Sequence, residues 1–367
     1  MDMATRNEYI NTKLDIETEL PEKDIAFFDV RKEPFAVYGL YNYKTEDFFK
    51  RLPDDVAAAT SEGVVSHCRH TAGGRVRFST DSEYVAIKCD WLRTTRFSHL
   101  SVMGCSGFDM YIDTDVLGVS NFAGIFTPPY GVTEGYEAVI HFPDRRKRFI
   151  TINFPSYNRV ANLYIGLQED ATLGEGKKYR FEKPVVFYGS SITQGGCASH
   201  PGNNYQSILS RHLDFNYINL GFSGSGCGED AVVDYMASLE MSAFFSDYDH
   251  NASLDGLRQT HLKMYQKIRE KHPDIPYIMM SKIDADSGCI WYDDTINRRR
   301  VILETLNYAL DHGDRNVYFI DGESMFRCDY EDCATVDSVH PNDFGFLRVA
   351  ENVEGLFHRI INEGKMK

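Results

Sequence analysis

The chain has 367 residues, 43% of them hydrophobic, and a formal net charge of −15 at pH 7. That hydrophobic content is enough for packed cores and too high for a disordered protein. The negative charge argues against a nucleic acid or an anionic membrane surface as a partner, because both need a basic binding surface.

The sequence shows no sign of a membrane anchor or a secretory signal. No apolar run approaches the ~20 residues that cross a bilayer. The polar start, MDMATRNEYINTK, has neither the basic region nor the apolar region of a signal peptide. None of the eight cysteines forms a C-x-x-C pair, which favours free thiols over a zinc site. We therefore expect a cytoplasmic protein.

The first half of the chain has the pattern of short β-strands. Apolar residues alternate with polar ones, or β-branched and aromatic residues gather, in RVRFST (75–80), EYVAIKCDW (83–91), FDMYID (108–113), FITINF (149–154) and ANLYIGL (161–167). Many short strands without clear helices predict a β-sandwich, jelly-roll-like in type. We assign residues 1–172 to this N-terminal domain and expect one short helix at residues 46–51.

The second half, residues 173–367, alternates strands with helices after a charged connection. Apolar strand candidates are VVFYG (185–189), YINLGF (217–222), SAFFSDY (242–248), PYIMMSK (276–282) and NVYFIDG (316–322). Helical patterns cover residues 254–271, 294–312 and 344–362. This alternation predicts an α/β domain whose parallel sheet is covered by helices on both faces.

Four polar stretches fall where a parallel sheet forms its binding sites. They are GSSITQGG (189–196), GFSGSGCGED (221–230), SDYDHNAS (246–253) and TVDSVHPND (335–343). Three of them follow a predicted strand, and the fourth precedes the last helix. Because ligands bind beyond the carboxyl ends of parallel strands, we expect all four at one edge of the sheet.

These stretches contain the parts of a nucleophilic site. A serine hydroxyl becomes a good nucleophile only when a base accepts its proton. His340 is a candidate base, and Asp337, three residues earlier, can fix its tautomer. Pro341 disfavours a helical conformation at His340, so the pair should lie in a loop. The Gly224 N–H and the Asn251 amide are candidate donors to an oxyanion.

From about Lys183 onward, the chain resembles the SGNH hydrolases, also called GDSL-type esterases. The family's nucleophile falls on Ser191 in GSSIT (189–193), its Asp-x-x-His on Asp337 and His340, and its oxyanion hole on Ser191, Gly224 and Asn251. The resemblance implies a flavodoxin-like α/β/α fold. It also implies a serine esterase that works through an acyl-enzyme without a cofactor or metal.

This sequence departs from the family pattern at two places, and it carries a second motif. Ser190 replaces the usual aspartate before the nucleophile, and DYDHNA (247–252) replaces the usual Gly-x-Asn-Asp. GFDMY (107–111) is similar to the Gly-x-Asp-Leu-Tyr motif of a subgroup with an N-terminal β-sandwich. Because such sandwiches resemble carbohydrate-binding modules, the likeness makes an acetylated sugar one candidate substrate.

Other interpretations of the same residues remain open at this point. A phosphate-binding loop is one alternative for GSSITQGG, but the stretch lacks the Lys-Ser/Thr of a P-loop and the G-x-G-x-x-G spacing. It also differs from the Gly-x-Ser-x-Gly elbow of α/β-hydrolases, which needs glycine at position 193. Asp249 and His250 form either a second acid–base pair or internal loop contacts. Cys197 and Cys227 are either nucleophiles or small buried residues. Asp109 and Tyr111 either line a cleft or are ordinary strand residues.

Three functions fit the sequence in different degrees. The first is an esterase for small, short-chain esters, such as acetyl esters, on a carbohydrate or a small metabolite. The second is an acyltransferase that uses the same triad. The third is a sugar-binding protein with a silent hydrolase domain, against which the presence of Ser191, Asp337 and His340 argues.

Overall fold

The computed structural model describes residues 13–94, 96–283, 292–327 and 329–366. Contacts between residues divide the chain into two units. Unit 1 comprises Met1–Arg51, Arg69–Tyr179 and His200–Gly202, and unit 2 comprises Leu52–Cys68, Arg180–Ser199 and Asn203–Lys367. The predicted division after residue 172 differs from these units, because residues 52–68 belong to unit 2, and residues 173–179 and 200–202 belong to unit 1.

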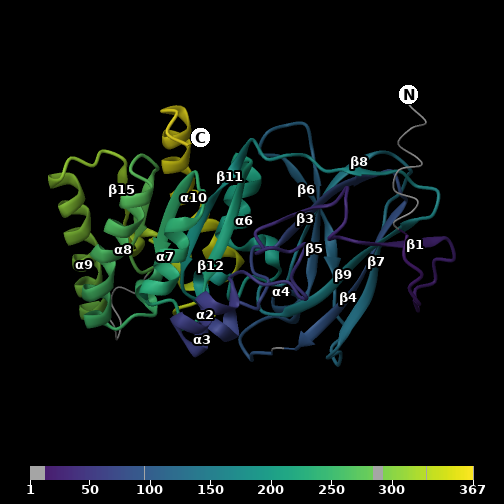
Figure 1. Ribbon diagram of the computed structural model, residues 1–367, viewed down its shortest axis with the longest axis horizontal. Helices are drawn as coiled ribbons and strands as arrows, with labels where there is room; N and C mark the ends of the chain where they lie inside the picture. Colours follow the sequence, from purple (N-terminus) through teal and green to yellow (C-terminus); the bar gives the residue numbers. More distant parts are fainter. Residues whose placement is uncertain (1–12, 95, 284–291, 328, 367) are drawn as a thin grey trace. The chain divides into compact units, whose positions relative to one another are not determined.

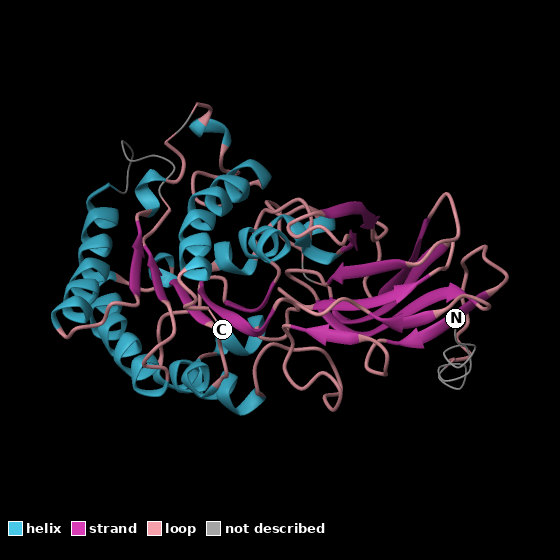
Figure 2. Ribbon diagram, turned by 90° about the horizontal axis from the view of Figure 1, so that it is seen from above, coloured by secondary structure: helices cyan, strands magenta, loops and turns pink. Residues whose placement is uncertain are grey.

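Unit 1 consists mainly of two antiparallel sheets, drawn in magenta in Figure 2. The first has the strand order β1 (Ile25–Asp29), β9 (Arg159–Gln168), β4 (Tyr84–Arg93) and β7 (Gly135–His141). The second has the order β10 (Leu173–Glu175), β3 (Arg75–Thr80), β8 (Arg148–Asn153), β5 (Phe108–Asp113) and β6 (Ser120–Phe126), with β2 (Ala36–Tyr38) paired to β3. One short helix, α4 (Val102–Ser106), precedes β5.

The two sheets enclose one apolar core. Val85 and Ile87 of β4 belong to the same buried cluster as Val76 and Phe78 of β3 in the other sheet. Residues two apart along a strand point to the same face, so each sheet contributes one apolar face. This is the arrangement of a β-sandwich, and the jelly-roll topology stays a prediction.

Unit 2 is a parallel sheet between two layers of helices (Figure 1). The strand order is β12 (Phe215–Gly221), β11 (Phe181–Gly189), β13 (Ala243–Asp247), β14 (Tyr277–Met280) and β15 (Val317–Ile320). In order along the chain this is 2-1-3-4-5, the order of flavodoxin-like sheets. The prediction of an α/β domain with a parallel sheet is therefore confirmed.

Alternation along β11 explains why helices cover both faces of the sheet. Val186 and Tyr188 belong to one buried cluster, and Val185 and Phe187 belong to the other. The first cluster is covered by α2 (Asp54–Thr60), α3 (Glu62–His67), α7 (Asp230–Ser238), α8 (Leu254–Lys271) and α9 (Tyr292–Asp311). The second is covered by α6 (Tyr205–Leu213) and α10 (Asp343–Asn362).

The helix expected at residues 46–51 is wrong, because the first two described helices begin later, at Asp54 and Glu62. The backbone of residues 46–51 is bonded elsewhere instead: the Phe49 N–H donates to the Val160 carbonyl at 3.1 Å, and the Lys50 carbonyl accepts from the Tyr41 N–H at 2.8 Å. Asp54 and Asp55 then lie in the first helical turn, where the helix dipole favours negative charge.

No helix in the described part of the chain is both long enough and apolar enough to cross a bilayer. None of the six cysteines in the described part of the chain forms a disulfide.

Asp247 ends β13 and is buried beneath the turn that follows β11. One carboxylate oxygen accepts from Thr193 Oγ1 at 2.5 Å, and the other accepts from Tyr205 Oη at 2.9 Å. Burial raises the pKa of Asp247 to about 7, although both hydrogen bonds act in the opposite direction. The folded protein therefore keeps the proton to a higher pH than the unfolded chain, whose aspartates titrate near pKa 3.9.

Asp247 should make folding less favourable as the pH rises. Between the pKa of Asp247 in the unfolded chain and its raised pKa in the folded protein, only the folded state binds the proton. Raising the pH through this range therefore removes the stability that proton binding provides. Between about pH 5 and about pH 8, the free energy of unfolding should fall more in the wild type than in Asp247→Asn. Urea unfolding at both pH values measures this difference. Parallel pH dependences in the two proteins would contradict the prediction.

Candidate active site

Ser191 begins a one-turn helix, α5 (Ser191–Gln194), directly after β11, an inner strand of the sheet. Ser190 caps this turn: its Oγ accepts from the Ile192 N–H at 3.1 Å, while its own N–H donates to Thr193 Oγ1 at 2.9 Å. Ser190 is fully buried, whereas Ser191 is partly exposed. Of the two adjacent serines, Ser190 therefore holds the turn and Ser191 is the accessible hydroxyl.

Ser191, His340 and Asp337 form a continuous line of hydrogen bonds. Ser191 Oγ lies 2.8 Å from His340 Nε2, and His340 Nδ1 lies 2.8 Å from Asp337 Oδ2. The other oxygen of Asp337 accepts from the backbone N–H of His340 at 2.8 Å. A carboxylate on Nδ1 places the ring's lone pair on Nε2, which faces the serine hydroxyl.

The loop that carries His340 is closed by backbone bonds. The Val336 N–H donates to the His340 carbonyl at 2.9 Å, and a β-bridge joins Thr335 to Pro341. Ser338 adopts a φ of 68° at the tip of this loop. Burial alone would raise the pKa of Asp337, but hydrogen bonds from the backbone and ring of His340 outweigh it and hold this pKa below its usual value.

Gly224 lies in a tight turn that follows β12. The N–H groups of Ser225 and Gly226 both donate to the Phe222 carbonyl, at 2.9 and 3.1 Å. Gly224 has a φ of +64°, and a Cβ added there would meet nothing within 4 Å. Its N–H donates to no group within the described part of the chain. Gly224 therefore carries a backbone donor that is exposed and has no partner within the described residues, and its role in an oxyanion hole stays a prediction.

Asn251 has a different environment from the one that an oxyanion donor needs. Its Nδ2 lies 2.9 Å from the Phe222 carbonyl and 3.2 Å from the Gly226 carbonyl. Both N–H bonds of the amide are thus directed to the turn that carries Gly224. In this structure Asn251 braces that turn. Its amide can donate to an oxyanion only if it gives up one of its two hydrogen bonds to the turn carbonyls.

Arg298 of α9 contacts the loop that carries Asn251, which the sequence did not suggest. Its Nη1 donates to the carbonyls of Asp249 and Ala252, on either side of Asn251. Asp249 Oδ2 also accepts from the Lys282 N–H at 2.7 Å. Asp249 therefore takes part in holding its own loop, and no sequence pattern near Arg298 marks a partner so distant along the chain.

Cys197, Cys227 and His250 are held in their neutral forms. Burial raises the pKa of Cys197 to about 12 and that of Cys227 to about 11. Thiolates are therefore scarce at neutral pH, which weakens a nucleophilic role for either cysteine. Burial lowers the pKa of His250 well below its usual value, and the positive charge of Lys282 adds a smaller effect in the same direction. This imidazole therefore stays neutral.

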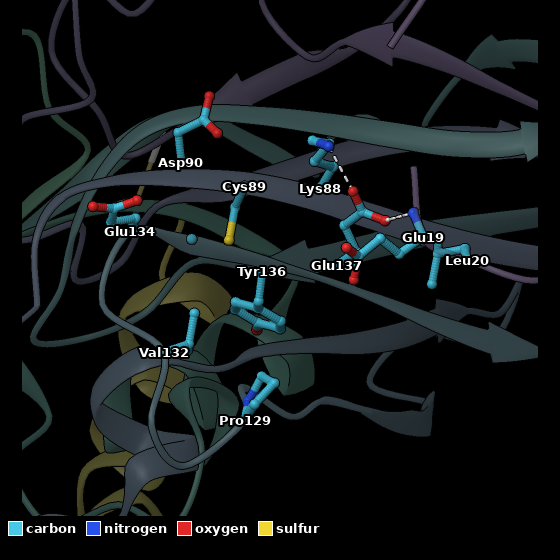
Figure 3. Close-up of a pocket in the computed structure, with 11 residues that line it drawn as sticks. Glu19, Leu20, Lys88, Cys89, Asp90, Pro129, Val132, Glu134, Tyr136 and Glu137 are labelled. Carbon is cyan, nitrogen blue, oxygen red and sulfur yellow. Dashed lines mark hydrogen bonds and ion pairs between the residues drawn. The ribbon is translucent and has the colours of Figure 1, made fainter. Parts of the chain in front are cut away.

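A hollow of about 550 Å³ lies in unit 1 beside β4 and β7 (Figure 3). Lys88 Nζ donates to Glu137 Oε1 at 2.5 Å, and the other oxygen of Glu137 accepts from the Glu19 N–H at 3.1 Å. These ionic groups are thus already paired. The lining contains none of the five predicted site residues; it consists of Glu19, Leu20, Lys88, Cys89, Asp90, Pro129, Val132, Glu134, Gly135, Tyr136 and Glu137.

Known families match both parts of the chain. Residues 182–358 match the GDSL-like lipase/acylhydrolase family, and residues 25–173 match the N-terminal domain of SGNH-hydrolase-type esterases, named GxDLY. No protein with a curated description matches the chain at the sequence level.

Solved structures resemble the chain over nearly its full length. A protein described as a GDSL-like lipase from Bacteroides ovatus has 28% identity and a TM-score of 0.83, over 94% of this chain and 99% of its own. The salicylyl-acyltransferase SsfX3 of a tetracycline biosynthetic pathway has 17% identity and a TM-score of 0.77, over 92% and 98%. A family two carbohydrate esterase from Clostridium thermocellum has 13% identity and a TM-score of 0.61, over 90% and 100%. The chain thus belongs to the SGNH, or GDSL-type, hydrolases that carry a GxDLY N-terminal domain.

Proposed function

We propose that this protein is a serine esterase that cleaves small esters through an acyl-enzyme on Ser191. The observation that carries the proposal is the line from Ser191 Oγ through the ring of His340 to Asp337, with both contacts at 2.8 Å. A serine, a base and an orienting carboxylate in hydrogen-bond contact are the parts that nucleophilic acyl transfer needs.

In the first half-reaction, Ser191 Oγ attacks the ester carbonyl carbon while its proton passes to His340 Nε2. Asp337 stabilises the resulting imidazolium and keeps the ring in place. When the tetrahedral intermediate collapses, the bond to the alcohol oxygen breaks and His340 protonates that oxygen. The product of this step is a free alcohol and an ester of Ser191.

In the second half-reaction, a water molecule attacks the acyl group, and His340 accepts a proton from that water. The carboxylic acid leaves, and the proton returns to Ser191 Oγ. In both halves the carbonyl oxygen gains negative charge. The Gly224 N–H and the Ser191 N–H are the proposed donors to it, and the Asn251 amide joins them if it releases one turn carbonyl.

Both hydrolysis and acyl transfer fit this scheme, because they differ only in what attacks the acyl-enzyme. One protein of this fold is called an acyltransferase and another a carbohydrate esterase. We favour hydrolysis of a short-chain ester, such as an acetyl ester, of a carbohydrate or a small metabolite. Adding an alcohol acceptor during turnover and measuring the transferred product separates the two reactions.

Ser191→Ala should lose nearly all esterase activity, whereas Ser190→Ala should keep most of it. Ser191 Oγ contacts the base, while Ser190 Oγ only caps α5, and the loss of such a cap costs ~0.5–2 kcal/mol of stability. Hydrolysis of p-nitrophenyl acetate and labelling by a fluorophosphonate measure both variants, with Ser190→Ala as the matched control. Equal losses in the two variants would refute the assignment.

Acetyl esters should be hydrolysed faster than octanoyl esters. The loops that carry Ser191, Gly224, Asn251 and His340 are rich in small and polar residues, which offer little apolar surface for a long acyl chain. An acyl-chain series of p-nitrophenyl esters, repeated with acetylated sugars, measures kcat/KM for each length. A higher kcat/KM for octanoyl than for acetyl would overturn the preference.

Asn251→Ala should lower kcat by about 10²–10³ and leave KM nearly unchanged if the amide serves the oxyanion. The structure offers the competing role of a brace between the Phe222 and Gly226 carbonyls. A brace alone would lower the melting temperature and leave kcat of the folded fraction near that of the wild type. Thermal unfolding and steady-state kinetics on one preparation distinguish the two roles, and a folded variant within about threefold of wild-type kcat rules out the oxyanion role.

A further inference from the structure

The aspartate of the GFDMY motif holds a segment of chain that follows Ser191 in the sequence. Asp109 lies on β5 and is fully buried. One oxygen of its carboxylate lies 2.5 Å from His200 Nδ1 and accepts from the Gly202 N–H at 2.5 Å. The other accepts from Asn153 Nδ2 at 2.6 Å. Residues 200–202 belong to unit 1, so all of these contacts lie within that unit.

Two aromatic side chains complete the surface that receives this segment. The ring of Phe122 on β6 stacks on the His200 ring, with centroids 4.9 Å apart. A Cβ at Gly202 would lie 2.6 Å from Tyr111 Oη and 2.8 Å from Asp109 Oδ2, so only glycine fits there without a shift. We name Asp109, Tyr111 and Phe122 the motif cluster. It matches residues 200–202 in shape, hydrogen bonding and ring stacking.

The two residues that flank this segment are tied to the start of α10. The Ser199 N–H donates to Asp343 Oδ1 at 2.7 Å, and Ser199 Oγ donates to Asp343 Oδ2 at 2.5 Å. Asn203 Nδ2 donates to the same oxygen at 3.0 Å. These three contacts lie within unit 2. Asp343 lies three residues after His340, the proposed base. Its carboxylate therefore connects both ends of the segment to the loop that carries His340.

The stretch between Ser191 and Ser199 has little freedom to absorb a displacement. The Gly196 N–H donates to the Ser191 carbonyl at 2.8 Å. Cys197 adopts a φ of 72°, a conformation that costs energy for a non-glycine residue and persists only where surrounding contacts hold it. A shift of residues 199–203 should therefore be transmitted to the position of Ser191.

We propose that Asp109 is a positioning residue for Ser191, and that it acts by fixing His200–Gly202. The proposal rests on the proposed esterase function, and it gives the GFDMY motif a role that requires no sugar. Asp109 touches no reacting atom in this scheme. Its effect should fall on kcat, because a misplacement of about 1 Å at a reacting group can cost ~10²-fold in rate.

The test compares Asp109→Asn with Asp113→Asn, a change of the same kind four residues along the same strand. Asp113 is partly buried and accepts from Arg77 Nη2 at 2.9 Å and Thr151 Oγ1 at 2.7 Å, without a hydrogen bond to residues 200–202 within the described chain. Its loss disturbs the sandwich alone. Asp109→Asn should lower kcat for p-nitrophenyl acetate about 10- to 100-fold with KM within about twofold. Asp113→Asn should keep kcat within about twofold at a similar loss of melting temperature.

Gly202→Ala disrupts the contact between Gly202 and Asp109 while leaving the Asp109 carboxylate in place. It therefore tests the proposal if Asp109→Asn does not fold. It should show the same loss of kcat. The double variant should be no slower than the slower single variant, because both changes act through one contact. Multiplied losses, or equal kcat in Asp109→Asn and Asp113→Asn, would overturn the proposal.

Amide hydrogen exchange of the peptide that spans residues 192–204 gives a readout that does not depend on activity. Exchange should be faster in Asp109→Asn than in the wild type and unchanged in Asp113→Asn. If the wild type neither hydrolyses the ester nor reacts with a fluorophosphonate, the proposed function fails, whereas the exchange data still decide whether Asp109 fixes the segment. Unchanged exchange in Asp109→Asn would refute the proposal in either case.

Discussion

The hydrogen bond between Ser191 and His340 joins residues 149 positions apart, and much of unit 2 serves to make it possible. Ser191 is placed by the end of the inner strand β11, and His340 by a loop that leads into α10. The parallel sheet brings these two chain segments to the same edge, since the carboxyl ends of its strands lie together. A bond of 2.8 Å tolerates little error, so the loops at this edge must be held firmly.

Buried polar groups, and not only apolar packing, hold those loops. Asp247 accepts from Thr193 and Tyr205 beneath the Ser191 turn, and Arg298 donates to carbonyls on both sides of Asn251. A buried polar group costs free energy unless it is paired, so each of these contacts favours one loop conformation over its alternatives. The site thus depends on a shell of residues that do not themselves react.

Much of this arrangement follows from the sequence, and the exceptions have physical reasons. Strands such as β4 and β11 alternate or are strongly apolar, which is why their patterns predict them. The strands β6 and β7 were not predicted, because β6 is mostly only partly buried and contains a glycine, and β7 carries charge and is only partly buried. The helix expected at residues 46–51 is absent because the backbone there bonds to Tyr41 and to the distant Val160, a pairing that no local pattern reveals.

The site residues divide in the same way. Residue type and order along the chain suffice to name Asp337 and His340, because the sheet topology makes the convergence of the polar loops predictable. The choice of Ser191 over Ser190 comes from the family resemblance. The orientation of the Asn251 amide depends on carbonyls 25 and 29 residues away, and the partners of Asp109 lie 91 and 93 residues away. Such long-range pairs leave no periodic trace in one sequence, so only the structure reveals them.

The central claim is that Ser191 forms a covalent ester during turnover. Rapid acid quenching of the protein during hydrolysis of p-nitrophenyl acetate, followed by peptide mass spectrometry, tests it directly. The account predicts one acetyl group on the peptide that contains Ser191, formed together with a stoichiometric burst of p-nitrophenol. Turnover with the acetyl group on Cys197, on His340 or on no residue at all would contradict it.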